Sequence, residues 1–115
     1  PYDGVTSALQ IRISAEPMFD VREGLIRSGL YRDPSGIIWV NNSVVQEVLS
    51  SGVGDLSIAG FSAHLRREGY LVQTSTVHRV GGITVRAWGF APGFRADEGV
   101  SQTSTNTVRG VGMNE

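Results

Sequence analysis

Arginine is the residue type in this sequence best suited to chemistry with phosphate. All ten basic residues are arginine and none is lysine, and the planar guanidinium can bind phosphate oxygens or a guanine edge through two parallel hydrogen bonds. Five of the ten lie between Ser57 and Arg95, where Glu68 is the only acid, so this segment has a formal charge of +4. The segment up to Leu56 carries −3, and the segment from Ala96 on carries −2. The sequence therefore concentrates its capacity to bind anions in one part of the chain.

Patterns typical of catalysis or metal binding are missing from the sequence. The acids are scattered, no serine or threonine has an evident histidine and aspartate partner, and "GVGD" lacks the further glycines and the lysine of a phosphate-binding loop. The chain has no cysteine, and its two histidines, His64 and His78, are separated in sequence, which disfavours a zinc site. We therefore predict a protein that is not an enzyme and has no cofactor or metal.

Length and composition limit the class of protein. A chain of 115 residues with 40% hydrophobic and 18% charged residues fits one globular domain. No run reaches the roughly 18 consecutive apolar residues of a membrane span, and the N-terminus lacks a signal-peptide pattern, so we expect a soluble, cytoplasmic protein with no membrane partner. Because the first residue is Pro1 and not methionine, we expect a processed chain or a piece of a larger protein.

The beginning of the chain carries two predicted elements. Residues 1–15 are expected to form an N-terminal extension with a half-buried strand. The strand is indicated by an alternation of apolar residues, Leu9, Ile11 and Ile13. Glu16-Pro17 predicts the start of a first helix over 17–28, because proline is tolerated in the first turn and acids favour the positive end of the helix dipole. Gly29 is expected to end it.

A strand and a second helix follow the turn "YRDPSG". The run "IIWVN" is β-branched and aromatic and predicts a strand over 37–41. Ser43 and Gln46 have the three-residue spacing of a capping box. They precede an apolar stripe, so we predict a second helix over 44–50.

A third helix is predicted after "GVGD", capped by Asp55 or Ser57 and ended by Gly69. At about 100° per residue, one side of this helix is apolar: Ile58, Phe61 and Leu65. The opposite, outward side is small and rich in donors: Gly60, Ala63, His64 and Arg67, with Arg66 on its flank. Packing of the three helices is expected to give one shared core: Leu25, Trp39, Leu49, Ile58, Phe61 and Leu65.

Two strands complete the predicted domain of residues 16–92. They cover 70–80 and 83–90 and are joined by Gly81-Gly82, a pair suited to the type I′ turn of a tight hairpin. The polar remainder, 93–115, is expected to be a flexible tail.

The order of the predicted elements over residues 17–90 resembles that of the winged helix-turn-helix superfamily. This order is helix, strand, helix, turn, helix, strand, glycine turn and strand. The superfamily has an α+β fold of three helices with a small antiparallel sheet. The most specific part of the resemblance is "FSAHLRREGYL", which is similar to the end of a recognition helix passing into the first wing strand. More weakly, the chain is similar to winged modules of plasmid or phage replication proteins. The resemblance implies that the third helix enters a DNA major groove while the hairpin, the wing, lies along the backbone or in the neighbouring minor groove.

The candidate nucleic-acid-binding residues lie on these two elements. They are Ser57, Gly60, Ala63, His64, Arg66, Arg67, Arg79 and Arg86. Each has a simpler interpretation: Ser57 as a helix cap alone, the two small residues as helix packing, His64 as an ordinary surface residue, and the arginines as solvated or paired charges. Within the DNA interpretation Arg67 contacts the groove and Arg66 a phosphate, since adjacent residues diverge on a helix. The glycine turn places Arg86 opposite Val77 and His78 opposite Val85, on the two faces of the hairpin.

The predicted function is binding of double-stranded DNA in transcription control or replication, by a monomer, a homodimer or a module of a larger protein. The alternative is a winged-helix protein-interaction module that docks through the acidic N-terminal half or the apolar wing tip, Val80 and Ile83. The two differ in the surroundings of the four arginines at 66, 67, 79 and 86. An exposed surface without acids favours DNA, whereas neutralisation by Glu47, Asp55 and Glu68 favours the interaction module.

Overall fold

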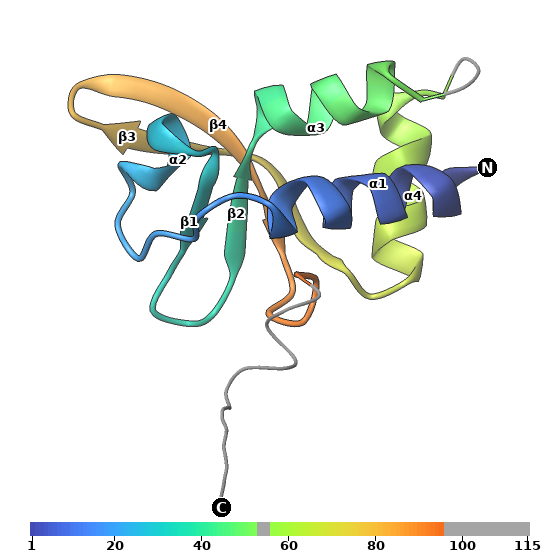
Figure 1. The fold of residues 1–115 in the computed structure, drawn as a ribbon, viewed down its shortest axis with the longest axis horizontal. Helices are drawn as coiled ribbons and strands as arrows, with labels where there is room; N and C mark the ends of the chain where they lie inside the picture. The colour runs from blue at the N-terminus through green and yellow to red at the C-terminus, as the bar shows by residue number, and fades with distance from the viewer. Residues whose placement is uncertain (53–55, 96–115) are drawn as a thin grey trace, which may run out of the picture.

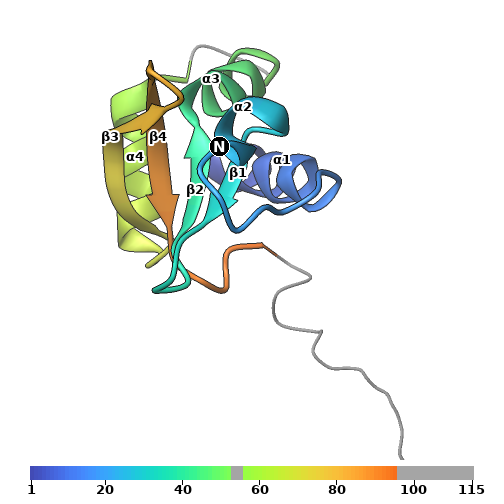
Figure 2. The same ribbon diagram turned by 90° about the vertical axis from the view of Figure 1, so that its left-hand side faces the viewer.

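The computed structural model describes residues 1–52 and 56–95, which form an α+β fold (Figure 1). Its elements in chain order are α1 (Tyr2–Ser14), α2 (Gly24–Arg27), β1 (Leu30–Arg32), β2 (Ile38–Asn41), α3 (Asn42–Ser50), α4 (Ile58–Arg67), β3 (Leu71–Val80) and β4 (Ile83–Phe90). The strands make one antiparallel sheet in the order β1-β2-β4-β3, visible from right to left in Figure 2. The α+β class is confirmed, but the predicted order of one helix and one strand before α3 is wrong.

The N-terminal segment is the helix α1 and not the predicted strand. Val5, Leu9 and Ile13 recur every four residues and are all buried, whereas Ile11 is 72% exposed. In a helix residues four apart share a face, while in a strand Leu9, Ile11 and Ile13 would do so. The predicted spacing of two residues is therefore wrong for this segment. The apolar side chains with a spacing of four pack into the main core.

The first predicted helix is also wrong, because only Gly24–Arg27 of the range 17–28 is helical. The segment before it is extended at Phe19, which bridges Tyr31 of β1, and the Arg32 N–H donates to the Phe19 carbonyl. A Cβ at Gly24 would collide with the Leu30 carbonyl and the Phe19 side chain. The close approach of these segments therefore requires a residue without a side chain at position 24. The predicted stop at Gly29 is confirmed by its φ of +88°.

The strand β1 is not predicted by the sequence, although the turn that follows it is. Asp33 organises this turn by accepting hydrogen bonds from the N–H groups of Ser35 and Ile37, at 2.9 and 3.1 Å. Its second carboxylate oxygen accepts from the indole N–H of Trp39 at 2.9 Å. An aspartate at the first turn position commonly satisfies the following N–H groups in this way. The turn thereby holds β1 and β2 as a hairpin.

The two predicted helices after β2 are confirmed as α3 and α4. The cap of α3 is Asn41, whose Oδ1 accepts from the Ser43 N–H at 2.9 Å, so the predicted capping role of Ser43 is wrong. Ser57 caps α4 by accepting from the Gly60 N–H at 3.0 Å; Asp55 lies outside the described residues. Gly69 ends α4 with a φ of +79°, as predicted.

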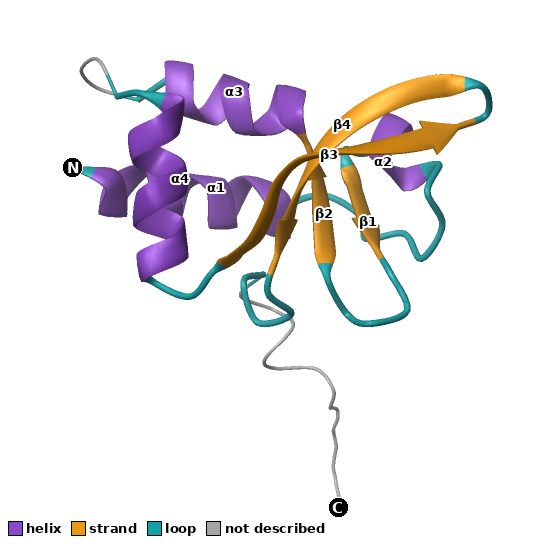
Figure 3. Ribbon diagram, turned by 180° about the vertical axis from the view of Figure 1, so that it is seen from behind, coloured by secondary structure: helices purple, strands orange, loops and turns teal. Residues whose placement is uncertain are grey.

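The β3–β4 hairpin extends beyond α1, α3 and α4 and lies beside α2 (Figures 1 and 3). Gly81 and Gly82 have φ values of 55° and 84°, as a type I′ turn requires. The predicted register is confirmed, with Val77 opposite Arg86 and His78 opposite Val85. The register shifts between Leu71 and Thr76, so this part of β3 is a bulge.

Two apolar clusters cover the two faces of the sheet. The main cluster joins α1, α3 and α4 to one face and contains fully buried Phe61, Leu65 and Phe90. The second cluster joins α2 to the other face and contains Leu25 and Trp39, so the prediction of one shared core is wrong. Phe94, from the segment expected to be a tail, is fully buried and stacks on Phe90 with ring centroids 4.3 Å apart. Residues 96–115 lie outside the described part of the chain.

Candidate nucleic-acid interface

Gly60 and His64 lie between α4 and α1. A Cβ at Gly60 would collide with the hydroxyl of Tyr2. The His64 ring is 8% exposed and stacks on the Tyr2 ring at 5.7 Å, and its Nε2 is 3.3 Å from a carboxylate oxygen of Asp3. The prediction that both residues face outward is therefore wrong, because α1 covers this side of α4. They belong to helix packing and not to the candidate interface.

Because His64 is buried, the exposed stripe of α4 is a different set of residues from the one predicted. Ala59, Ala63 and Arg66 are exposed on the side opposite buried Phe61 and His64. At about 100° per residue, Arg66 lies closer to the middle of this stripe than the also exposed Arg67. Arg66 therefore lies at the centre of the exposed stripe and Arg67 at its side, the reverse of their predicted placement on the helix.

Arg79 and Arg86 are exposed on one face of the hairpin. Arg79 is opposite Thr84, and its Nη1 lies 3.4 Å from the Thr84 hydroxyl. Arg86 donates from Nη1 to the carbonyl and the hydroxyl of Ser75, at 3.3 and 3.4 Å. Because side chains alternate along a strand, both arginines share the face of Trp88, which is the face that α1, α3 and α4 cover farther along the sheet.

The four arginines at 66, 67, 79 and 86 have no acidic partner within residues 1–52 and 56–95. The Glu47 carboxylate instead binds Arg12 across α1 and α3, with an N–O distance of 2.8 Å. Glu68, at the C-cap of α4, has no ion pair with them. Arg95 differs from the four because it is buried. The positive charge of the four arginines is therefore not neutralised by described residues.

A polar groove lies between α3, α4 and the hairpin, the elements that carry or contact these arginines. Its volume is about 270 Å³, and its lining residues are Asn42, Gln46, Ile58, Ser62, Thr74, Ser75 and Trp88. The indole N–H of Trp88 donates to Asn42 Oδ1 at 3.0 Å and orders one wall. Arg86 reaches the groove through its contacts with Ser75. None of the lining residues carries a negative charge.

Sequence reasoning missed the polar residues of this groove. Ser62 follows Ile58 by four residues, so a helix wheel places it beside the apolar stripe and could have indicated it. Thr74 and Ser75 lie in the bulge of β3, which no sequence pattern marks. Their orientation into the groove therefore had no signal in the sequence.

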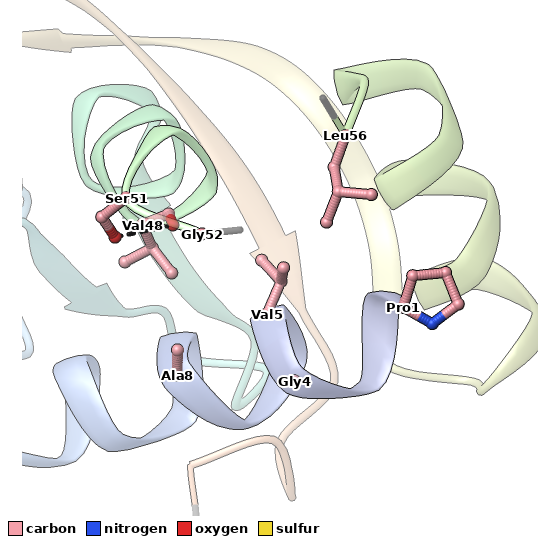
Figure 4. Close-up of a pocket in the computed structure, with 8 residues that line it drawn as sticks. All are labelled: Pro1, Gly4, Val5, Ala8, Val48, Ser51, Gly52 and Leu56. Carbon is pink, nitrogen blue, oxygen red and sulfur yellow. Dashed lines mark hydrogen bonds between the residues drawn. The ribbon is translucent and has the colours of Figure 1, made fainter. Parts of the chain in front are cut away.

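A second hollow lies between α1 and α3 and has a different character (Figure 4). Its volume is about 310 Å³, and it is lined by Pro1, Gly4, Val5, Ala8, Val48, Ser51, Gly52 and Leu56. The lining is mostly apolar and contains no charged side chain. We assign no chemistry to it.

The described groups with perturbed titration lie on the opposite face of the sheet from the groove. Burial, with a smaller effect of Arg22, lowers the pKa of His78, although Asp33 opposes this. Burial opposes ionisation of Asp33, but hydrogen bonds from Trp39, Ile37 and Ser35 outweigh it and lower the pKa of that carboxyl. The His78 ring packs edge-on against Trp39, with centroids 4.6 Å apart. These groups contact Trp39 of the second cluster and do not line the groove.

Two kinds of site are not found in the part of the chain that the structure describes. No three histidine, cysteine or acidic side chains gather in a way that could hold a metal ion. No described helix combines the length and the apolar character needed to cross a membrane.

Comparisons of the chain with known protein families, with curated proteins and with solved structures gave no match. The function is therefore inferred from the fold and from the surface formed by α3, α4 and the hairpin.

Proposed function

We propose that this chain is a winged-helix domain that binds double-stranded DNA, in transcription control or in replication. The observation that carries the proposal is the set of four exposed arginines, 66, 67, 79 and 86, without an acidic partner among the described residues. They lie on α4 and on the hairpin, which together line a polar groove. Uncompensated arginines beside neutral hydrogen-bonding groups suit a phosphate backbone.

The order of the elements from β2 onward supports the winged-helix part of the proposal. The chain passes through β2, α3, α4, β3 and β4, and these three strands are adjacent in the order β2-β4-β3. The helix α1 packs against α3 and α4 and takes the place of the first helix of the fold. On this assignment α2 and β1 are additions between the first helix and the first strand.

The exposed stripe of α4 suits close contact with a duplex. Ala59 and Ala63 are small, so the helix can approach the floor of a major groove, and Arg66 beside them can reach a phosphate or a guanine. Arg79 and Arg86 on the hairpin then contact the flanking backbone. Ser57 remains the helix cap, and the positive end of α4 adds a favourable field for an anion.

Fluorescence anisotropy with a labelled mixed-sequence duplex tests this function. We expect Arg66→Ala/Arg67→Ala to weaken binding at least tenfold. The matched control is Arg22→Ala/Arg27→Ala, which removes the same charge from the segment that packs on the other face of the sheet. It should weaken binding much less, through the long-range field alone. Equal loss in both variants would contradict a localised interface on α4.

Exposed isoleucines favour the protein-interaction module as the second candidate. Ile11 on α1 is 72% exposed, and Ile83 beside the hairpin turn is 56% exposed. Single exposed apolar residues are common on protein surfaces, so these two support the alternative less strongly than the arginines support DNA. No duplex binding at low salt would favour this candidate.

A further inference from the structure

The groove contains several hydrogen-bond donors that the fold does not use. The Thr74 hydroxyl makes no hydrogen bond to the residues that the structure describes. The Ser75 hydroxyl accepts from Arg86 and keeps its own proton for another acceptor. Arg86 uses only Nη1 in its two contacts, so its remaining N–H groups are free to bind a ligand. Neutral donors thus line one concave surface, and one guanidinium lies against Ser75 in its wall.

The backbone at Ser75 is held in an uncommon conformation at this point. Its φ is +50°, and it is the one residue other than glycine with a positive φ in the described chain. This backbone conformation is energetically less favourable for serine than for glycine. The bulge ends the regular alternation of β3, and this brings Thr74 and Ser75 together at the groove. Arg86 binds both the carbonyl and the hydroxyl of Ser75 and so fixes the bulge.

We propose that this groove is a binding notch for a phosphodiester, the repeating unit of the nucleic-acid backbone. Thr74, Ser75 and Gln46 donate to its oxygens, and Arg86 supplies the positive charge. The notch rests on the proposed DNA-binding function and adds a backbone anchor between α4 and the hairpin. One guanidinium among neutral donors matches the single negative charge of a phosphodiester.

The two tryptophans provide internal reporters for this proposal. The Trp88 indole N–H lies in the wall of the groove, bonded to Asn42, whereas the Trp39 indole N–H bonds Asp33 on the opposite face of the sheet. In a ¹⁵N-labelled protein each indole gives its own resonance. Addition of a mixed-sequence DNA duplex should shift the Trp88 resonance and leave the Trp39 resonance in place.

Two isosteric substitutions in β3 distinguish a loss of phosphodiester binding from a general effect on the structure. Thr74→Val removes a hydroxyl that lines the groove, and Thr76→Val removes one that pairs opposite Ala87 in the second cluster. Loss of a hydrogen bond to a charged group should weaken duplex binding by about ten- to hundredfold in Thr74→Val. Thr76→Val should bind like the wild type. Because the removed hydroxyl is itself uncharged, the slope of log affinity against log salt concentration should be unchanged in Thr74→Val, whereas Arg86→Gln should reduce it.

The outcomes distinguish the notch from the function on which it rests. If the duplex binds by anisotropy but Trp88 does not shift, or Thr74→Val binds like Thr76→Val, the notch is wrong and the DNA-binding function stands. Absence of any duplex binding at low salt overturns both. A Trp88 shift together with selective weakening in Thr74→Val supports the notch.

Discussion

At the scale of single residues, tight contacts decide where the chain can turn and where helices can meet. Gly24 lies against the Leu30 carbonyl, and Gly60 lies against the Tyr2 hydroxyl. Both contacts join segments that no sequence pattern places together, because Phe19, β1 and α1 are not predicted in their observed positions. The concentration of positive charge in one part of the chain can be predicted, since the residue types are read directly from the sequence. The burial of His64 cannot, because it depends on α1.

A methyl group added at Gly24 should destabilise the fold. We expect Gly24→Ala to lower the free energy of unfolding by about 2 kcal/mol or more, because the new Cβ meets backbone as well as side chain. Gly4→Ala in α1 is the control, since no atom outside its own helix lies within 4 Å of its added Cβ. It should be neutral or stabilise by up to about 1 kcal/mol. Urea unfolding followed by tryptophan fluorescence measures both, and similar values would contradict the tight turn at Gly24.

The lowered pKa of His78 predicts a loss of stability in mild acid. Burial, aided by Arg22, disfavours the charged imidazole in the folded state, so the unfolded chain takes up its proton at a higher pH than the folded chain. The contribution of His78 is fully present above 6.5, the ordinary pKa of a histidine. It is lost as the pH falls from there through the lowered folded value. His78→Phe keeps a ring against Trp39 and should lose less stability than the wild type between about pH 7.5 and about pH 5.5. Equal losses in urea unfolding would contradict the shift.

At the scale of elements, the sequence predicts the region from β2 to β4 well and the first third of the chain poorly. The spans of α3, α4 and the hairpin carry local signals, such as Gly69 and the Gly81-Gly82 turn, that agree with their tertiary surroundings. In α1 the apolar residues fit two periods, and tertiary packing selects the helical one. In the range 17–28 an apolar spacing typical of a helix is overridden by pairing of Phe19 with β1. The register shift in β3 leaves no pattern in the sequence.

Two substitutions in α1 test its helical period. Leu9→Ala should lower the free energy of unfolding by about 2 to 5 kcal/mol, because Leu9 is fully buried in the main core. Ile11→Ala should change it by less than about 0.5 kcal/mol, since the side chain is exposed. A strand would place both residues on the same face. Comparable losses in thermal or urea unfolding would therefore favour the strand.

At the scale of the whole molecule, one face of the sheet carries the groove and the arginines at 66, 67, 79 and 86, and the other face carries the second cluster. The sheet separates the two faces, so Trp88 and Trp39 report on opposite sides of the same protein. The helix α1 closes the side of α4 that carries Gly60 and His64. This leaves the stripe of Ala59, Ala63 and Arg66 exposed beside the groove. The proposed DNA binding would therefore take place at α4 and the hairpin.

The salt dependence of duplex binding tests the central claim most directly. Each phosphate contact contributes about −0.9 to the slope of log affinity against log salt concentration. Contacts by two to four of the arginines at 66, 67, 79 and 86 therefore predict a slope between about −2 and −4 for the wild type. The slope should become shallower in Arg79→Ala/Arg86→Ala and stay nearly the same in Arg22→Ala/Arg27→Ala. A duplex affinity that does not change with salt, or no binding at low salt, would contradict DNA binding through this surface.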